Sequence, residues 1–137
     1  MTRGERNNNP GNIDFNPRNN WKGQVGIEDA PASGKARFAK FDSPENGIRA
    51  LAVLLINYQR KGFNTINKIV SRYAPAHENK TDKYAENVSR WTGIPADAVL
   101  TDADLIPLVT AIIRQESGFI PYRTSIIAEG VRRARLA

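Results

Sequence analysis

The sequence contains no cysteine and a single histidine, His77. The first absence excludes disulfides, thiolate nucleophiles and zinc sites with cysteine ligands. The second excludes any site that needs two imidazoles. A serine nucleophile served by His77 is not indicated either, because the chain has no Gly-x-Ser-x-Gly motif. Acid–base chemistry in this chain must therefore depend on carboxylates, and neither a metal nor a cofactor is expected.

Long apolar stretches are also missing. The longest uninterrupted run, Ala50–Ile56, has seven residues, far fewer than the roughly 18 that a membrane-spanning helix needs. The N-terminus is charged and lacks the apolar core of a signal peptide, so we expect synthesis in the cytoplasm without a leader. With 137 residues, 40% hydrophobic and 25% charged, residues 1–137 have the length and composition of one globular domain.

Positive charge is concentrated in the middle third of the chain. The formal net charge is +6; residues 1–47 hold seven basic and six acidic side chains, residues 48–93 eight and three, and residues 94–137 five and five. A basic excess suits any polyanion, and a solvated basic face is the simpler interpretation. No nucleic-acid-binding motif accompanies the excess, so nucleic acid ranks last among the partners considered.

The hydrophobic pattern predicts a mainly helical α+β domain with a small β-hairpin near the N-terminus. Short aromatic and branched runs at 21–27 and 37–41 predict the hairpin, after a loop rich in Asn, Gly and Pro. Apolar residues at three- and four-residue steps, bounded by capping residues, predict the helices that follow. Their expected ranges are about 44–61, 65–74, 81–92, 105–117 and 125–134.

One acidic residue continues the buried stripe of a predicted helix. The stripe of the 105–117 helix passes through positions 105, 108, 109 and 112, and Glu116 is next. Burial and the negative end of the helix dipole both disfavour the ionised form, so we expect a raised pKa for Glu116. A carboxyl group protonated near neutral pH can act as a general acid. From the residues alone, a second possibility stays open: Glu116 turns to the rim and pairs with Arg114, Arg123 or Arg132.

The segment Ala111–Pro121, AIIRQESGFIP, resembles the Glu-Ser motif of lytic transglycosylases. A second resemblance is to flagellar-type β-N-acetylglucosaminidases. It is carried by Asn8–Ile13, Trp21, Phe38, Phe41, Ser43, Gly47–Ile48 and Thr81–Ala85. In both families the Glu helix precedes these segments, whereas here it follows them, so the chain looks like a circularly permuted lysozyme-like domain. The whole chain also resembles small phage proteins that begin RGxRNNNPGNI and serve as virion or lysis components.

The resemblance implies a peptidoglycan-cleaving glycosidase or lytic transglycosylase, acting on the β-1,4 bonds between N-acetylmuramic acid and N-acetylglucosamine. It makes Glu116 the general acid and Tyr84 similar to the active-site tyrosine of the glucosaminidases, although Tyr84 also lies on an apolar stripe that suits the core. An inverting hydrolase needs a second carboxylate as base, whereas a transglycosylase needs none. Glu78 and Asp82 are the candidates for that base, and both positions also suit ordinary surface carboxylates.

Substrate contacts are expected from polar and aromatic side chains near these motifs. Amides can pair with the hydroxyl and N-acetyl groups of a glycan, and aromatic rings can stack on sugars. The same residue types are also common in turns and in satellite cores. The candidate substrate-binding residues are Asn9, Asn12, Trp21, Thr81, Ser117 and Tyr122.

The expected partner is the glycan strand of peptidoglycan, bound by a monomer. The basic segment 131–135 is a candidate contact to an anionic cell envelope. As an endolysin or virion-associated lysin, the protein would reach the wall in the periplasm through a holin or with the infecting particle. The alternative is a virion structural or wall-binding protein that kept the fold and lost turnover, which the lack of a clear second carboxylate favours.

Overall fold

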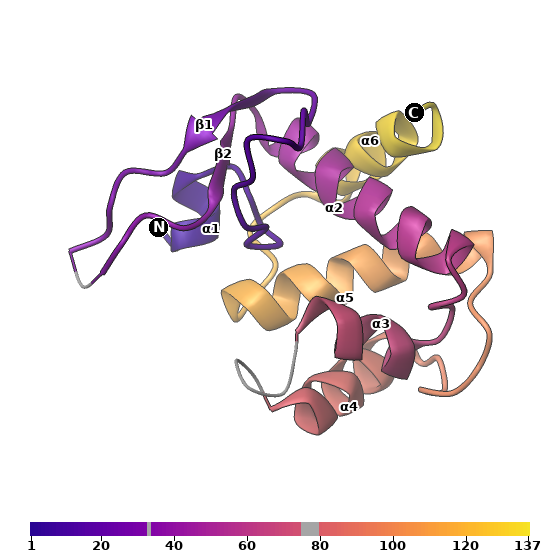
Figure 1. Cartoon of the computed structure of the whole chain (residues 1–137). Coiled ribbons are helices and arrows are strands. Elements are labelled where there is room, and N and C mark those ends of the chain that lie inside the picture. Colours follow the sequence, from indigo (N-terminus) through magenta and orange to yellow (C-terminus); the bar gives the residue numbers. More distant parts are fainter. Residues whose placement is uncertain (33, 75–79) are drawn as a thin grey trace.

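The computed structural model describes residues 1–32, 34–74 and 80–137, and it confirms a mainly helical fold with a small N-terminal antiparallel hairpin (Figure 1). In chain order its elements are α1 (Arg3–Arg6), β1 (Gln24–Ile27), β2 (Ala39–Phe41), α2 (Pro44–Arg60), α3 (Ile66–Tyr73), α4 (Thr81–Thr92), the 3₁₀ turn η1 (Asp102–Asp104), α5 (Leu105–Ser117) and α6 (Thr124–Arg135). No helix in these described ranges is long and apolar enough to cross a membrane.

The helix boundaries follow local signals in the sequence. Helix α2 begins as predicted, because the Ser43 hydroxyl accepts a hydrogen bond from the Asn46 N–H and Pro44 occupies the first helical position. Helices α4 and α5 end at Gly93 and Gly118, both with the left-handed backbone that glycine adopts without strain. These signals explain why the predicted helix ranges agree closely with the observed ones.

Two short strands and a short helix make up the N-terminal part. Strand β1 pairs antiparallel with β2, and an isolated bridge joins Asp14 to Phe38 beside them. Helix α1 falls in a segment that the sequence analysis took as loop. Its cap is reciprocal: the Thr2 hydroxyl accepts from the Glu5 N–H, and the Glu5 carboxylate accepts from the Thr2 N–H. This Thr-x-x-Glu capping box is the signal that was overlooked.

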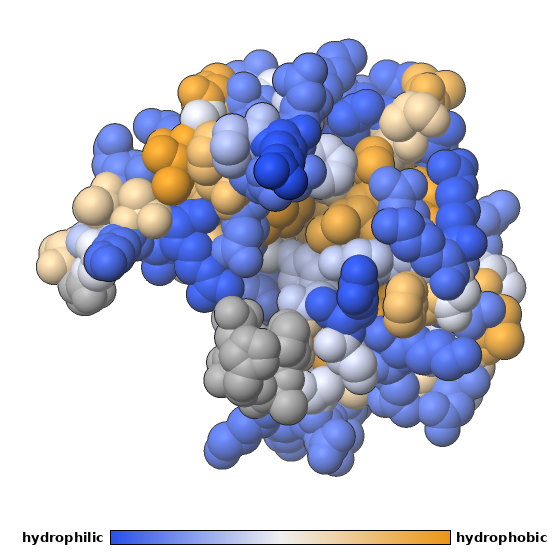
Figure 2. Space-filling model, viewed as in Figure 1, coloured by the Kyte–Doolittle hydropathy of each residue, from blue (hydrophilic) through white to orange (hydrophobic). Residues whose placement is uncertain are grey.

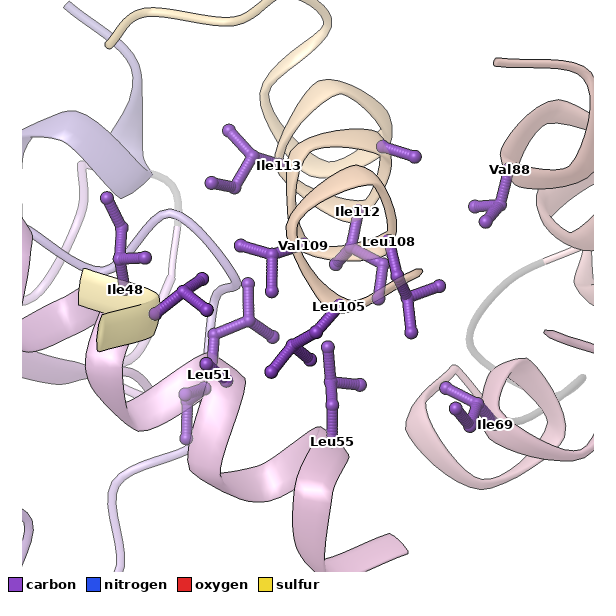
Figure 3. Close-up of a cluster of buried hydrophobic side chains, with 14 of the residues drawn as sticks. Ile48, Leu51, Leu55, Ile69, Val88, Leu105, Leu108, Val109, Ile112 and Ile113 are labelled. Atoms are coloured by element: carbon purple, nitrogen blue, oxygen red, sulfur yellow. The ribbon is translucent and has the colours of Figure 1, made fainter. Parts of the chain in front are cut away.

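The hydrophobic core is centred on α2 and α5, whose apolar faces meet (Figure 3). The labelled core residues are Ile48, Leu51 and Leu55 on α2, and Leu105, Leu108, Val109, Ile112 and Ile113 on α5. Each is at most 3% exposed, and burying one such side chain contributes about 1.5–3 kcal/mol. On the other side of α5 lie Ile69 of α3 and Val88 of α4. This packing fixes the position of α5, and with it the acidic residue in its last turn.

Candidate functional site

A cleft of about 490 Å³ opens between the N-terminal segment and helices α2 and α3, with the end of α5 in its lining. Figure 2 shows this face of the molecule hollowed between the N-terminal segments and the α3 region. The lining residues are Gly11, Asn12, Ile13, Asp14, Asn16, Asn19, Arg37, Phe38, Leu54, Tyr58, Arg72, Tyr73 and Glu116. The volume lies within the range of small-molecule and cofactor sites, about 300–1,000 Å³.

Glu116 receives two hydrogen bonds from neutral groups. Asn12 Nδ2 donates to Oε1 at 3.1 Å, and the Tyr84 hydroxyl donates to Oε2 at 2.9 Å. The side chain is partly buried, in the last turn of α5. Burial raises the pKa of the Glu116 carboxyl and outweighs the two hydrogen bonds and the charge of Arg37, which all lower it. Glu116 is therefore a carboxyl group whose protonated form is favoured, as its place on the helix predicts.

The second possibility for Glu116, an ion pair at the rim, is not observed among the described residues. Arg132 pairs with Glu129 at 2.7 Å, and the Arg114 guanidinium lies 4.2 Å from the centre of the Trp91 ring. Arg123 forms no ion pair with Glu116 in the described part of the chain either, and the observed partners of Glu116 are the neutral Asn12 and Tyr84.

Tyr84 belongs to the core and to the site at once. Its ring is 2% exposed and packs in the core, while its hydroxyl reaches Glu116. Burial, and then the nearby Glu116 charge, raise the pKa of Tyr84 well above its ordinary value. The hydroxyl therefore stays protonated and remains a hydrogen-bond donor. The two roles that the sequence suggested for Tyr84, packing in the core and lying beside the acid, coexist in one side chain.

Asn12 adopts a left-handed backbone conformation, with φ +50°. Asparagine is enriched in this region among non-glycine residues, and here the turn brings its amide to Glu116. The Nδ2 of Asn12 is used by Glu116, while its Oδ1 is buried and has no hydrogen-bond partner in the described part of the chain. Asn12 is thus the predicted substrate-binding residue that lines the cleft and touches the candidate acid.

The cleft also contains an ion pair that the sequence analysis missed. Arg37 Nε lies 2.6 Å from Asp14 Oδ1, and both residues line the cleft together with Glu116. Asp14 is therefore a second carboxylate in the cleft. The two residues are 23 positions apart; Arg37 begins a predicted strand run and Asp14 lies in the preceding loop, and neither pattern indicates that they pair. The isolated bridge between Asp14 and Phe38 is what brings them together.

Tyr73 links helix α3 to the N-terminal segment. Its hydroxyl donates a hydrogen bond to the Gly11 carbonyl. A Cβ atom at position 11 would lie 2.6 Å from the Tyr73 hydroxyl oxygen and 3.1 Å from Leu51, so only glycine fits there without displacement. The contact joins residues 62 positions apart and connects two walls of the cleft, and no local sequence pattern predicts it.

Asn9 was predicted to bind substrate, but the structure gives it a role within the fold. It is fully buried, and its Nδ2 donates to the carbonyl oxygens of Ile13 and Ala39, while its Oδ1 accepts from the Ile13 N–H. Both amide protons are therefore used within the fold. Asn9 holds the N-terminal turn against β2 and offers no free donor to a ligand.

Four other predicted substrate contacts do not line the cleft. Trp21 and Tyr122 are partly buried and pack against the core, where burial of their large rings stabilises the fold. The Thr81 hydroxyl donates to the Ala74 carbonyl at 3.0 Å, so it is used to hold the start of α4. Ser117 is the last residue of α5 and lies outside the cleft lining. These residues lie outside the lining of this cleft, and their contact with an extended substrate stays a prediction.

The two predicted candidates for a base have different outcomes. Glu78, like His77 beside it, lies outside the described residues. Asp82 is exposed in the first turn of α4 and lines a separate groove, so it is an ordinary first-turn carboxylate. Over residues 1–32, 34–74 and 80–137, no three histidine or acidic side chains come together in a way that could hold a metal ion.

A bacteriophage protein is similar to almost the whole length of this chain. The chain is 37% identical over 131 residues to Protein P5 of Pseudoalteromonas phage PM2, and the match covers 93% of this chain and 79% of the phage protein. The chain belongs to the P5 family. No protein-family model matches it. Membership of the P5 family supports the bacteriophage context that the N-terminal motif predicts.

In this P5-family chain, the cleft combines two carboxylates in different surroundings. Glu116 is partly buried, bonded by neutral donors and favoured in its protonated form. Asp14 is exposed and ion-paired with Arg37. The cleft thus holds one carboxyl group whose pKa is raised by burial and a second one that is exposed and ion-paired.

Proposed function

We propose that this P5-family protein is a lysozyme-like peptidoglycan-cleaving enzyme, with Glu116 as the general acid. It would act on the β-1,4 bonds between N-acetylmuramic acid and N-acetylglucosamine, as a phage endolysin or virion-associated lysin at the wall in the periplasm. The observation that carries the proposal is a partly buried carboxyl with a raised pKa in a cleft of about 490 Å³. A carboxyl group whose pKa is raised by burial is suited to donate a proton to the leaving glycosidic oxygen.

The lining of the cleft supports a carbohydrate as the ligand. Side-chain amides can donate to and accept from sugar hydroxyls and acetamido groups, and aromatic rings offer flat apolar faces. The amide-bearing lining residues are Asn12, Asn16 and Asn19, and the aromatic ones are Phe38, Tyr58 and Tyr73. This mixture of amides and rings along an open cleft suits an extended amino-sugar polymer.

We propose Asp14 as a candidate for the second carboxylate in place of the exposed Asp82, and Glu78 stays a candidate. The ion pair of Asp14 with Arg37 holds the carboxylate in one orientation. In a hydrolase, Asp14 would activate water or stabilise the positive charge on the sugar ring. In a lytic transglycosylase the substrate's own hydroxyl attacks, and Asp14 would serve only the developing charge. The alternative of a wall-binding protein without turnover rested on the lack of a clear second carboxylate, and Asp14 is a candidate for that group.

The test is Glu116→Gln, measured by clearing of chloroform-treated Gram-negative cells and by release of soluble fragments from purified sacculi. Glutamine keeps the size of the side chain and can still accept from Asn12 and donate to the Tyr84 oxygen, but it has no proton to give. We expect activity to fall by about 100-fold or more. The matched control is Glu86→Gln, the same change at an exposed residue of α4, which should retain full activity.

Full activity of Glu116→Gln would overturn the proposal. Sacculus binding by the unaltered protein without release of fragments would instead favour the wall-binding alternative. Product masses separate the two reaction types, because a transglycosylase leaves an anhydro-sugar that is one water lighter than the product of hydrolysis. Asp14→Asn sharpens the same distinction: it should reduce hydrolysis strongly and transglycosylation only in part.

A further inference from the structure

A second hollow, of about 410 Å³, lies where helix α6 packs along helix α2. We call it the α2–α6 groove; it is lined by Lys22, Arg49, Glu129, Arg132, Arg133 and Leu136, with the adjoining chain end. Arg49 precedes the cleft residue Tyr58 by nine positions on α2, and nine residues at 3.6 per turn place the two side chains on opposite faces of the helix. The groove therefore opens away from the cleft.

The side chains of the α2–α6 groove carry four positive charges and one negative charge. Glu129 already accepts from Arg132 at 2.7 Å and from Arg133 at 2.8 Å, and these two arginines lower the pKa of Glu129 to about 2. Its negative charge is therefore matched within α6. Lys22 and Arg49 form no ion pair with any described residue, so the groove keeps an excess of positive charge open to a ligand.

The geometry of α6 orients two of these cations. Arg132 and Arg133 lie three and four residues after Glu129, the spacings at which helix side chains meet, and Arg133 also donates to Asn46 Oδ1 at 3.3 Å. Their guanidinium groups are held by these bonds before any ligand arrives. Arg132 already gives its Nε and one Nη to Glu129, so a phosphate would accept charge-assisted hydrogen bonds from the remaining N–H groups of the two arginines.

An exposed apolar residue at the edge of the groove favours a membrane over a soluble polyanion. Leu136 lines the groove and is 74% exposed. Basic side chains beside an exposed apolar one are typical of surfaces that rest on anionic bilayers, where the cations meet headgroup phosphates and the apolar group enters the interface. Arg135, by contrast, donates to the Asp102 carbonyl at 2.8 Å and faces another part of the surface.

We propose that the α2–α6 groove binds the headgroup phosphates of anionic phospholipids and holds the protein at a membrane surface. The proposal revises the envelope contact that segment 131–135 predicts. Arg132 and Arg133 belong to it and Arg135 does not, while Lys22 and Arg49 are added from distant parts of the chain. Since the groove and the cleft lie on opposite faces of α2, the bound protein keeps its cleft open. The inference does not depend on the reaction proposed for the cleft.

The test is co-sedimentation of the full chain with vesicles of equal parts phosphatidylglycerol and phosphatidylcholine, compared with vesicles of phosphatidylcholine alone. We expect binding only to the anionic vesicles, with a decrease as salt is added. Each basic residue near an anionic surface contributes roughly a fivefold change in partitioning, so Lys22→Gln with Arg49→Gln should weaken binding by about 25-fold. Leu136→Ser should weaken it by a smaller factor that does not depend on salt.

The matched control is Lys61→Gln with Lys68→Gln, which removes the same charge from exposed positions just after α2 and on α3, outside the groove lining. Unchanged binding in this control and weakened binding in the groove variant would support the proposal. Equal weakening in both variants, or equal binding to the two kinds of vesicle, would overturn the proposal. It would also be overturned if a DNA duplex displaced the protein from vesicles and this displacement depended on Lys22 and Arg49. Thermal melts verify that each variant folds, and Glu116→Gln should bind vesicles as the unaltered chain does.

Discussion

The N-terminal hairpin region and the floor of the cleft each hold a glutamate shielded from solvent, and the two surroundings act on the carboxyl group in opposite directions. Glu28 is 4% exposed and accepts hydrogen bonds from Arg3, from Asn7 and from two backbone N–H groups. The Arg3 guanidinium, first, and these hydrogen bonds hold the pKa of Glu28 well below its ordinary value. At Glu116, two neutral donors leave burial dominant, and its pKa is raised.

The comparison of Glu28 with Glu116 shows that the surroundings of a glutamate decide whether it suits a structural or a chemical role. A carboxylate with a cation and several donors keeps its charge fixed and can join parts of the chain. A carboxyl that is buried with few donors can gain and lose a proton. The two regions are also connected, because the Arg37 N–H bonds Glu28 while the Arg37 side chain holds Asp14 in the cleft. Glu28 thus helps to hold Arg37, and with it the side of the cleft that faces Glu116.

The largest effect should come from removing the fixed charge. Glu28→Gln should cost about 1–3 kcal/mol of unfolding free energy at neutral pH, because it weakens the buried hydrogen bonds of Glu28 while the Arg3 side chain, 33% exposed, is partly solvated. Since the folded-state pKa of Glu28 is lowered, its stabilisation is present above the unfolded pKa of about 4.3 and is lost as the pH falls below that value. Urea denaturation across this range measures both. The exposed control Glu86→Gln should lose less than about 0.5 kcal/mol of unfolding free energy. A loss as small as this for Glu28→Gln would contradict the structural role of Glu28.

A second prediction alters the donors of Glu116. Asn12→Ala removes a hydrogen bond that lowers the pKa of Glu116, so this pKa should rise further. An acid stays protonated below its pKa, and lytic activity should therefore persist to higher pH, with its basic limb displaced by up to about one pH unit. The control is Asn19→Ala, an exposed asparagine of the same cleft without a bond to Glu116. A displacement to lower pH, or an equal one in the control, would refute the assignment.

The smallest effect concerns the stability of Glu116→Gln. Because the folded-state pKa of Glu116 is raised, the folded chain binds its proton more tightly than the unfolded chain, and stability falls as the pH rises through the window above about 4.3. At neutral pH the glutamine variant should therefore be more stable than the unaltered protein, by up to about 1 kcal/mol. The gap should close below about pH 4. A less stable variant at neutral pH would mean that the carboxylate stabilises the fold.

The sequence predicts most of this fold because its helices are bounded locally. Ser43, Pro44 and Gly118 act on their own turns, and the apolar stripe on α5 is enough to place Glu116 beside the core. The helix α1 was missed although its cap is equally local. The expectation of one domain over residues 1–137 stays a prediction.

The cleft was less predictable because its contacts join distant segments. Asp14, Arg37 and Tyr73 meet through a β-bridge and a tyrosine hydroxyl, which no periodicity encodes. Asn9 and Asn12 are three residues apart and have the same side chain. Only the turn between them sends one amide into the fold and the other to Glu116. Residue type alone cannot separate two such neighbours.

The bond between Asn12 and Glu116 spans 104 positions of the chain. A ribosome that stops before α5 therefore releases a polypeptide with the asparagine and no acid for it to hold. Tyr84 would be made in such a fragment, but its hydroxyl would have no carboxylate to meet. The pairing of Asn12 with Glu116 therefore forms only after the chain has been synthesised through α5 and its late residues have packed against the earliest ones.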